Sequence, residues 1–295
     1  MDRTAAIETT TPNTAPAAAP PEVVYSPERG TGLSPRVLVE MVRSLVDSRE
    51  LTWRFFLRDF SARYRQSVLG YVWAVVSTLV TVFTFSWLNR NRVLPIGDTQ
   101  FPYPLFLMLN LTVWQFFAGG LSAATQSLVS AGSLIAKINF PRETLVIASI
   151  GQAVFEVVVR LVLLGVAFVL FRTAPHPGIL FIPLLLIPLT FWILGLGFFL
   201  ALVNGIMRDA GYMITFLLNF WMFVTPVIYP VPPGRSALFA LNPITPFVTA
   251  AQDLATRGTL APGSGLWLSS AIGLGLCLVS WRVFLVTGSR IAERV

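Results

Sequence analysis

Arginines gathered near residue 60 are the side chains of this sequence best suited to chemistry. Guanidinium groups bind phosphate through two parallel hydrogen bonds, so arginines at a membrane surface can hold a lipid phosphate. Alternatively, the charge only fixes which end of the next span stays in the cytoplasm, and this alternative stays open. Within twelve residues the cluster holds Arg54, Arg58, Arg63 and Arg65, with Asp59 as its one acid.

The same stretch has the pattern of a surface helix. Phe56, Leu57, Phe60 and Tyr64 recur at three- and four-residue intervals beside the arginines. This spacing places an apolar stripe next to a cationic face. The pattern predicts an amphipathic helix over residues 53–65 that lies in the lipid headgroup layer.

A second pair of charges lies inside an apolar run. Glu156 and Arg160 are four residues apart with the acid first, which is the favourable order for an ion pair on a helix. Isolated charges at that depth are costly, so the two should neutralise each other. A structural ion pair is the preferred interpretation, and a proton relay of the kind found in secondary transporters is the alternative.

The composition of the sequence indicates which kind of structure holds these charged residues. Hydrophobic residues make up 55% of the 295 residues and charged residues only 12%, which predicts a polytopic membrane protein. The net charge of +7 comes mostly from arginines at the ends of apolar runs, so it follows the positive-inside rule and does not indicate nucleic acid. The lone Cys277 and lone His176 exclude an intrachain disulfide and argue against a metal site.

Six segments are long and apolar enough to cross a bilayer. The basic residues, counted by side, place both termini in the cytoplasm, in agreement with an even number of spans. We therefore predict an all-α integral membrane protein with six transmembrane helices and an N-terminal amphipathic interface helix. The spans are expected at residues 69–88, 103–128, 145–171, 180–203, 212–229 and 266–286.

The remaining segments complete the predicted domain organisation. Residues 1–49 are interpreted as a disordered tail with a short surface helix over Pro35–Asp47, residues 50–288 as the transmembrane domain, and residues 289–295 as a cytoplasmic tail. Residues 230–265 are too apolar for a solvent loop and too interrupted by proline to span twice. They are predicted to form a re-entrant pair of half-helices between spans five and six, with an interfacial loop as the alternative.

Five stretches of the sequence have a distinctive pattern when taken together. They are residues 58–73 (RDFSARYRQSVLGYVW), 101–117 (FPYPLFLMLNLTVWQFF), 133–143 (SLIAKINFPRE), 208–230 (RDAGYMITFLLNFWMFVTPVIYP) and 241–247 (LNPITPF). Together they resemble the permeases of type-2 ABC exporters, in particular the polysaccharide branch that exports O-antigen, capsule and teichoic acid. The resemblance covers residues 50–286. One departure is that Asn110 and Leu111 stand where a glycine-leucine pair is usual.

This resemblance implies a homodimer in a bacterial plasma (inner) membrane, with each copy seated on a separate ABC ATPase subunit. It also implies a lipid-linked glycan as cargo, as in lipopolysaccharide export. ATP and magnesium would then bind the partner, and this chain would carry no cofactor. Independent support is that the sequence contains no GxxxxGK[ST] phosphate-binding loop.

The resemblance also implies roles for the loop after the second span. A short helix there would offer an apolar face to the ATPase, two cations would steer it, and a proline would end it. An ordinary positively charged loop is the alternative. These residues are Leu134, Ile135, Lys137, Ile138, Phe140, Pro141 and Arg142. The arginines near residue 60 could in addition guide the pyrophosphate of the cargo.

In the family, the first and fifth spans line the channel of the dimer. Aromatic rings stack on the C–H faces of sugars, and hydroxyl and amide groups exchange hydrogen bonds with sugar hydroxyls. The alternative is that these side chains only fill the bundle and allow close helix packing. The predicted lining is Trp73, Ser77, Thr81, Thr84, Phe85, Trp87, Phe216, Asn219, Phe220, Phe223 and Tyr229.

The function expected from all this is the permease subunit of an ATP-driven exporter of a lipid-linked polysaccharide. A drug or lipid exporter of the same superfamily is the alternative. A proton-coupled transporter is less favoured, since the last three spans do not repeat the first three. An enzyme is disfavoured because the loop carboxylates Asp98, Asp209 and Asp253 are scattered singly.

Overall fold

The computed structural model describes residues 35–64, 72–94, 96–135, 137, 140–207, 209–231, 239, 241–261, 263 and 265–291. Every regular element within these ranges is a helix, so the predicted all-α class is confirmed for the described part of the chain. The predictions for Arg65 and Ile138, and those for the side chains of Arg63 and Trp73, lie outside the described residues.

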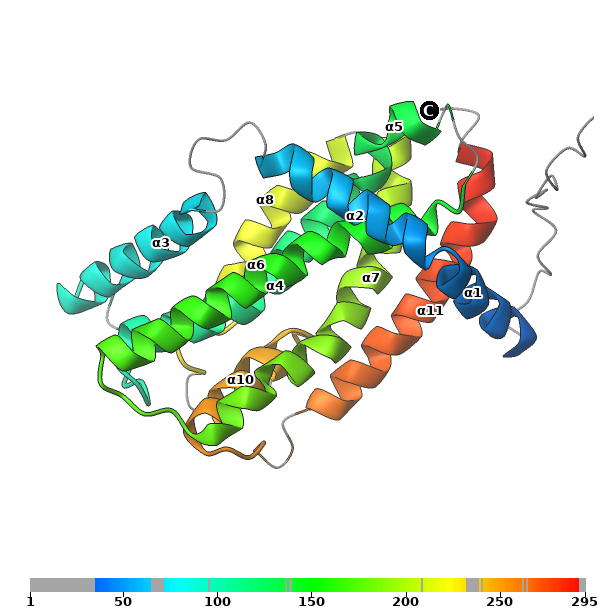
Figure 1. The fold of residues 1–295 in the computed structure, drawn as a ribbon. Coiled ribbons are helices and arrows are strands. Elements are labelled where there is room, and N and C mark those ends of the chain that lie inside the picture. The colour runs from blue at the N-terminus through cyan, green and yellow to red at the C-terminus, as the bar shows by residue number, and fades with distance from the viewer. Residues whose placement is uncertain are drawn as a thin grey trace, which may run out of the picture.

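Four helices are long and apolar enough to cross a membrane, and they form the body of the molecule (Figure 1). They are α4 (Tyr103–Ser130), α6 (Glu143–Leu170), α7 (Ile182–Ile206) with the preceding 3-10 turn η1 (Pro177–Phe181), and α11 (Leu266–Ile291). Each contains one predicted span and differs from it by a few residues at the ends. The chain is therefore a multi-pass membrane protein.

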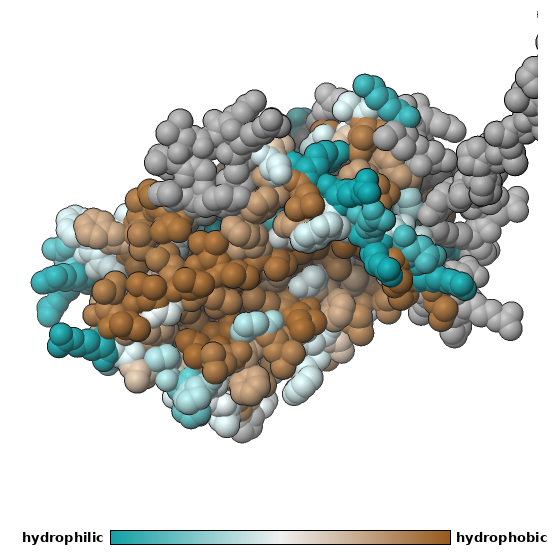
Figure 2. Space-filling model, viewed as in Figure 1, coloured by the Kyte–Doolittle hydropathy of each residue, from teal (hydrophilic) through white to brown (hydrophobic). Residues whose placement is uncertain are grey.

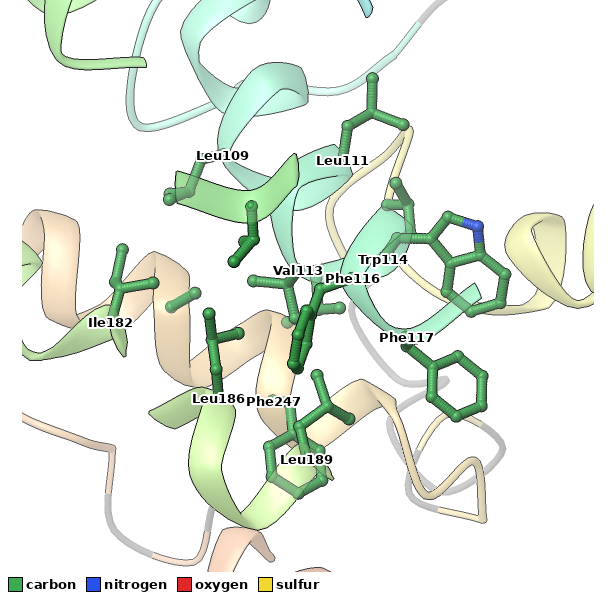
Figure 3. Packing of buried hydrophobic residues seen from close by; sticks show 14 of the residues in the cluster. Leu109, Leu111, Val113, Trp114, Phe116, Phe117, Ile182, Leu186, Leu189 and Phe247 are labelled. Carbon is green, nitrogen blue, oxygen red and sulfur yellow. The ribbon is translucent and has the colours of Figure 1, made fainter. Parts of the chain in front are cut away.

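Helix α4 is the centre of this bundle and packs against both α6 and α7. Leu109, Val113 and Phe116 on α4 are fully buried and meet residues of α7 and α10, as Figure 3 shows. Close approach of α4 and α7 depends on small residues, because a Cβ atom at Gly197 would lie 2.7 Å from the Ala124 side chain. Lipid tails are as apolar as leucine, so such tight packing, more than burial from water, stabilises a bundle in a membrane.

Helices α3 (Val72–Arg90) and α8 (Asp209–Val224) overlap the predicted first and fifth spans, and these two spans stay predictions. The predicted end of the fifth span, at Tyr229, is wrong: α8 ends five residues earlier, at Val224. Pro226 explains this, because proline lacks an N–H and disfavours helical geometry in the residue before it. The 16 residues of α8 reach only about 24 Å, less than the roughly 30 Å hydrocarbon core of a bilayer.

The short helices gather at the two ends of the bundle (Figure 1). Helices α1 (Pro35–Asp47), α2 (Arg49–Tyr64) and α5 (Gly132–Ile135) lie at one end, where α11 also finishes. Helix α10 (Thr245–Thr256) lies at the other end and is largely buried; it is the one helix of the predicted re-entrant pair with described bounds. Figure 2 shows a broad hydrophobic surface over α6, with hydrophilic residues over α2 and at the far left edge.

Candidate functional site

Helix α2 rests on α6 through a row of phenylalanines. A Cβ atom at Gly151 of α6 would come within 2.5 Å of the Phe56 ring, so glycine is needed for this contact. Phe60 packs edge-on against Phe155 of α6, with ring centroids 4.9 Å apart. The predicted apolar stripe is partly wrong, because Phe55 is buried and Leu57 is 42% exposed. The buried face of α2 is the face that carries the phenylalanines, because this face packs on protein.

Two of the α2 arginines lie beside carboxylates. The Arg54 Nη2 atom is 2.6 Å from Glu50 Oε1, and Arg58 Nη2 is 2.8 Å from Asp59 Oδ1. Exposed pairs of this kind contribute little stability, so both guanidinium groups can exchange their partner for a phosphate at small cost. Arg58 also lies over the Phe55 ring, 5.2 Å from its centroid, which holds it beside the buried face of α2.

The predicted coupling segment, residues 134–142, begins in α5 and contacts α2 directly. The Phe140 and Phe55 ring centroids are 5.1 Å apart. Leu134, Ile135 and Phe140 are half-buried and pack against a cluster that includes Phe55, so the chain itself covers part of the expected docking face. Lys137 is exposed. This segment is therefore in contact with α2, and α2 in turn contacts α6.

Pro141 and Arg142 form the junction between this segment and α6. The Thr144 N–H donates to the Pro141 carbonyl at 3.2 Å, and the Leu145 N–H donates to the Arg142 carbonyl at 3.1 Å. Glu143, the first residue of α6, is buried. Burial lowers the pKa of the Arg142 guanidinium from its ordinary value. The described residues 140–142 thus pass into α6 through a short hydrogen-bonded turn.

Glu156 and Arg160 lie together on α6. The Arg160 Nη2 atom donates to Glu156 Oε2 at 3.2 Å, and Gln152 Nε2 donates to Glu156 Oε1 at the same distance. Arg160 also donates from Nε to the Thr78 hydroxyl of α3 at 3.5 Å, while its Nη1 atom is buried with no hydrogen-bond partner. This group of side chains joins α6 to α3, which favours the structural interpretation of the pair.

The predicted channel residues of α8 lie on an exposed aromatic face. Phe216, Phe220 and Phe223 are each more than half exposed in the single chain, and the first two rings stack with centroids 4.7 Å apart. Asn219 lies exposed among them. Tyr229 follows the end of α8 and donates its hydroxyl to the Phe223 carbonyl. Apart from Tyr229, these residues lie exposed in the part of the chain that the structure describes.

The predicted channel residues of α3 divide into two groups. Ser77, Thr84 and Trp87 are exposed, and Thr81 is half-buried with its hydroxyl donating to the Ser77 carbonyl at 2.9 Å. Phe85 differs, because it packs against the main core of the bundle. Four of the described α3 residues are therefore exposed or half-buried at the surface, and the fifth, Phe85, is partly buried against the core.

A buried hydrogen-bond network at the outer end was missed by the sequence reasoning. Asn110 of α4 donates from Nδ2 to the Val227 carbonyl at 3.0 Å and accepts at Oδ1 from Gln252 of α10, also at 3.0 Å. We call these three residues the outer clamp. The clamp fixes the irregular segment after α8 against α4 and α10. Its one sequence signal is Asn110 itself, a buried amide at the position where the resemblance expects glycine.

Asn242 continues this network toward α8. Its Nδ2 atom donates to the Thr225 hydroxyl at 2.8 Å, and its Oδ1 atom accepts from the Trp221 indole at 3.1 Å. Trp221 packs edge-on against Phe117 of α4 at 5.4 Å. The end of α8 is thus held from two sides, and the bond from Asn110 satisfies the Val227 carbonyl, which the helix break would otherwise leave unpaired.

The opposite end of α8 is held by a single buried asparagine, Asn204 of α7. Its Nδ2 atom donates to the Thr125 carbonyl of α4 at 3.0 Å, and its Oδ1 atom accepts the Gly211 N–H at 2.8 Å. One side chain therefore joins α4, α7 and the start of α8.

A polar cavity beneath α2 was also missed. It has a volume of about 430 Å³ and lies between α2, α4 and α6. Ser122, Gln126 and Ser130 line it at four-residue steps along α4, opposite Gln152 and Glu156 of α6. The sequence signal for this cavity was the row of polar residues inside each apolar span. Polar groups within a membrane face protein or water, so two such rows indicate a shared polar space. Glu156 lies on the wall of this cavity.

Comparison with known proteins identifies the family. Residues 50–254 match the family model described as ABC-2 type transporter, which covers more than half of the chain. The chain belongs to this family. It is also 28% identical over 271 residues to an O-antigen export system permease protein RfbA of Myxococcus xanthus, covering 88% of this chain and 100% of that protein.

Two further relatives of this chain have the same description. Both are O-antigen export system permease proteins RfbA of Klebsiella pneumoniae, 23% and 22% identical over 208 residues, with 69% of this chain and 79% of each relative covered. The matched region includes α2, the coupling segment and most of α10. The chain is therefore a component of a membrane transporter, and its elements are to be interpreted as parts of a transport pathway.

Proposed function

We propose that this chain is the permease subunit of an ATP-driven exporter that moves a lipid-linked polysaccharide across the plasma membrane. The observations that carry the proposal are the exposed aromatic face of α8 and the hydroxyl-bearing face of α3, in a chain whose relatives are described as O-antigen export permeases. Aromatic and hydroxyl groups suit a sugar polymer better than they suit bulk lipid. A second copy of the chain would complete the path, so a homodimer belongs to the proposal.

The driving force would come from an ABC ATPase that binds at the end of the bundle holding α5. Lys137 is exposed there, where it can steer an acidic partner surface. A stroke on the coupling segment would pass through Phe140 to Phe55 and so to α2. Because α2 lies across α6 and α6 is bonded to α3 through Arg160, the stroke would reach the channel helices.

The arginines of α2 would meet the cargo at the membrane surface. Arg54 and Arg58 can release their exposed carboxylates to bind a pyrophosphate, which arginine holds with two parallel bonds. ATP and magnesium would bind the partner subunit, with both termini of this chain in the cytoplasm. A drug or lipid exporter would share the fold, and the cargo assay below distinguishes it from a polysaccharide exporter.

Purification from the native membrane in mild detergent tests the driven-exporter proposal. A stoichiometric P-loop ATPase that copurifies with the chain supports it, and loss of that subunit on Lys137→Glu substitution would assign the docking site. A chain that purifies alone and responds to a proton gradient would contradict it. Stimulation of the ATPase by a lipid-linked glycan, but not by a drug or a diacyl lipid, would assign the cargo.

A further inference from the structure

A groove on the surface of α6, far from α2 and the coupling segment, has the shape and polarity of a lipid site. It has a volume of about 590 Å³ and lies between the end of α6 and the start of α7. Its length is apolar, formed by Leu161, Leu164 and Phe168 of α6 and by Leu180 of η1, and Arg172 lies at its end. We propose that the groove binds one anionic diacyl phospholipid, with an acyl chain along α6 and the phosphate on Arg172.

The depth of the groove matches that of a lipid. Helix α6 has 28 residues and so extends about 42 Å, which equals a bilayer including its headgroup layers. Because α6 begins at the end of the bundle that holds the coupling segment, Arg172 lies at headgroup depth on the opposite side of the membrane. The apolar lining lies one to three turns deeper, at the depth of acyl chains. This site would therefore face the leaflet opposite the proposed ATPase.

Arg172 occupies a backbone position that ordinarily selects glycine. Its φ angle is +53°, and the two hydrogen bonds that define a Schellman helix end are present: Thr173 N–H to Phe168 O and Arg172 N–H to Val169 O, both 3.1 Å. A side chain in this left-handed conformation strains the backbone, whereas glycine does not. The helix dipole favours a cation at this helix end, but the left-handed position favours glycine and the positive-inside pattern opposes arginine on this side, so these factors alone do not select Arg172.

The walls of the groove are fixed before any ligand arrives. The His176 N–H donates to the Ala255 carbonyl of α10 at 2.8 Å, and His176 Nδ1 accepts the Gly178 N–H at 3.1 Å. These bonds attach the loop between α6 and α7 to the buried outer helix α10. A preformed site loses little ordering entropy on binding.

Gly165 opens the groove toward its ligand. A Cβ atom at this position would meet no atom within 4 Å, so glycine is not required by packing inside the chain. Val169 and Leu180 beside it are 77% and 79% exposed. In lipid, an acyl chain gains no hydrophobic free energy on entering such a groove, so selectivity must come from the headgroup. The cation at the end of the groove supplies it, and it favours a lipid with net negative charge.

Native mass spectrometry of the purified chain with added phosphatidylglycerol, or with diacylglycerol of the same acyl chains, tests the proposal. The wild type should bind phosphatidylglycerol roughly tenfold or more tightly, as a charge-assisted hydrogen bond implies. Arg172→Gly should abolish this preference while unfolding at or above the wild-type temperature in lipid-free detergent. Gly165→Phe should weaken binding of both lipids by filling the groove.

Two matched variants serve as controls. Arg92 also has a positive φ, 56°, at the corresponding position after α3, but it does not line the groove, so Arg92→Gly relieves the same strain and should keep the preference. Gly275 of α11 likewise has open space at its Cβ, so Gly275→Phe should leave lipid binding unchanged.

Three results would overturn the proposal. The first is that Arg172→Gly retains the preference for phosphatidylglycerol. The second is that Arg92→Gly loses the preference to the same extent. The third is that Gly165→Phe keeps its lipid and instead changes the association of protomers, which would show that a second copy of the chain covers the groove. Copurification of an ATPase is independent of all three results, so this proposal and the proposed function can fail separately.

Discussion

Replacing Asn110 by leucine tests whether the outer clamp holds the segment after α8. The side chain is fully buried, and Asn110→Leu keeps the branching at Cγ while leaving the Val227 carbonyl and the Gln252 amide without their partner. On the scale of soluble proteins, two stranded groups cost about 2–6 kcal/mol. Hydrogen bonds between membrane helices average only about 0.6 kcal/mol each, which gives about 1.2 kcal/mol for two.

We therefore expect Asn110→Leu to lower the free energy of unfolding by about 1–3 kcal/mol. This corresponds to a fall of about 2–10 °C in the unfolding temperature of the protein in lipid nanodiscs. Gln252→Leu removes only one of the two bonds and should cost less. The double variant should cost less than the sum of the singles, with a coupling of about 0.6–1.7 kcal/mol. Gln126→Leu, an exposed amide on the same helix, is the control and should not shift the temperature.

The reasoning is refuted if Asn110→Leu unfolds at the wild-type temperature or if the two substitutions are additive. Additivity would mean that Asn110 and Gln252 do not act through each other despite the 3.0 Å contact. If the substitution destabilises the protein, transport should fall as well, because the segment after α8 would no longer be fixed where it follows the aromatic face.

Three further predictions follow from the other contacts. Glu156→Leu should destabilise the protein more than the double variant Glu156→Leu/Arg160→Leu does, by about 1–3 kcal/mol in a nanodisc unfolding assay. The reason is that only the single change leaves the buried Arg160 guanidinium without its carboxylate. A single variant as stable as the double variant would contradict the structural pair. Phe140→Ala should remove an aromatic contact of about 0.5–1.5 kcal/mol and uncouple ATP hydrolysis from transport without loss of ATPase binding, and fully coupled transport would contradict this role. Phe216→Ala combined with Phe220→Ala should slow transport at unchanged unfolding temperature; a loss of stability instead would place these rings in a packing role.

The sequence predicted the membrane helices well because their signal is local. A run of about 20 apolar residues has few alternatives in a bilayer, so the helices α4, α6, α7 and α11 were expected close to where they lie. The failure at the end of α8 is also local, since the chain stays apolar through Val227 and Ile228 while Pro226 ends the helix. Hydropathy alone could not distinguish a buried irregular segment from a helix.

Contacts between residues far apart in the sequence could not be predicted from residue spacing. Asn110 and Gln252 are 142 positions apart, and no spacing rule connects an amide on one helix with an amide on another. The buried side of α2 was misjudged for a related reason, because Phe55 and Leu57 are equally apolar and only the packing partner decides which one is covered. The Glu156–Arg160 pair was found because it lies within one helix turn.

Transport by the reconstituted protein tests the central claim most directly. The chain would be reconstituted into liposomes with its copurified ATPase and a lipid-linked glycan, and delivery of the glycan to the opposite leaflet would be followed with an impermeant lectin. The account predicts delivery that requires ATP, ignores an imposed proton gradient, and is lost with Phe216→Ala and Phe220→Ala together. Delivery driven by the proton gradient without ATP would contradict it.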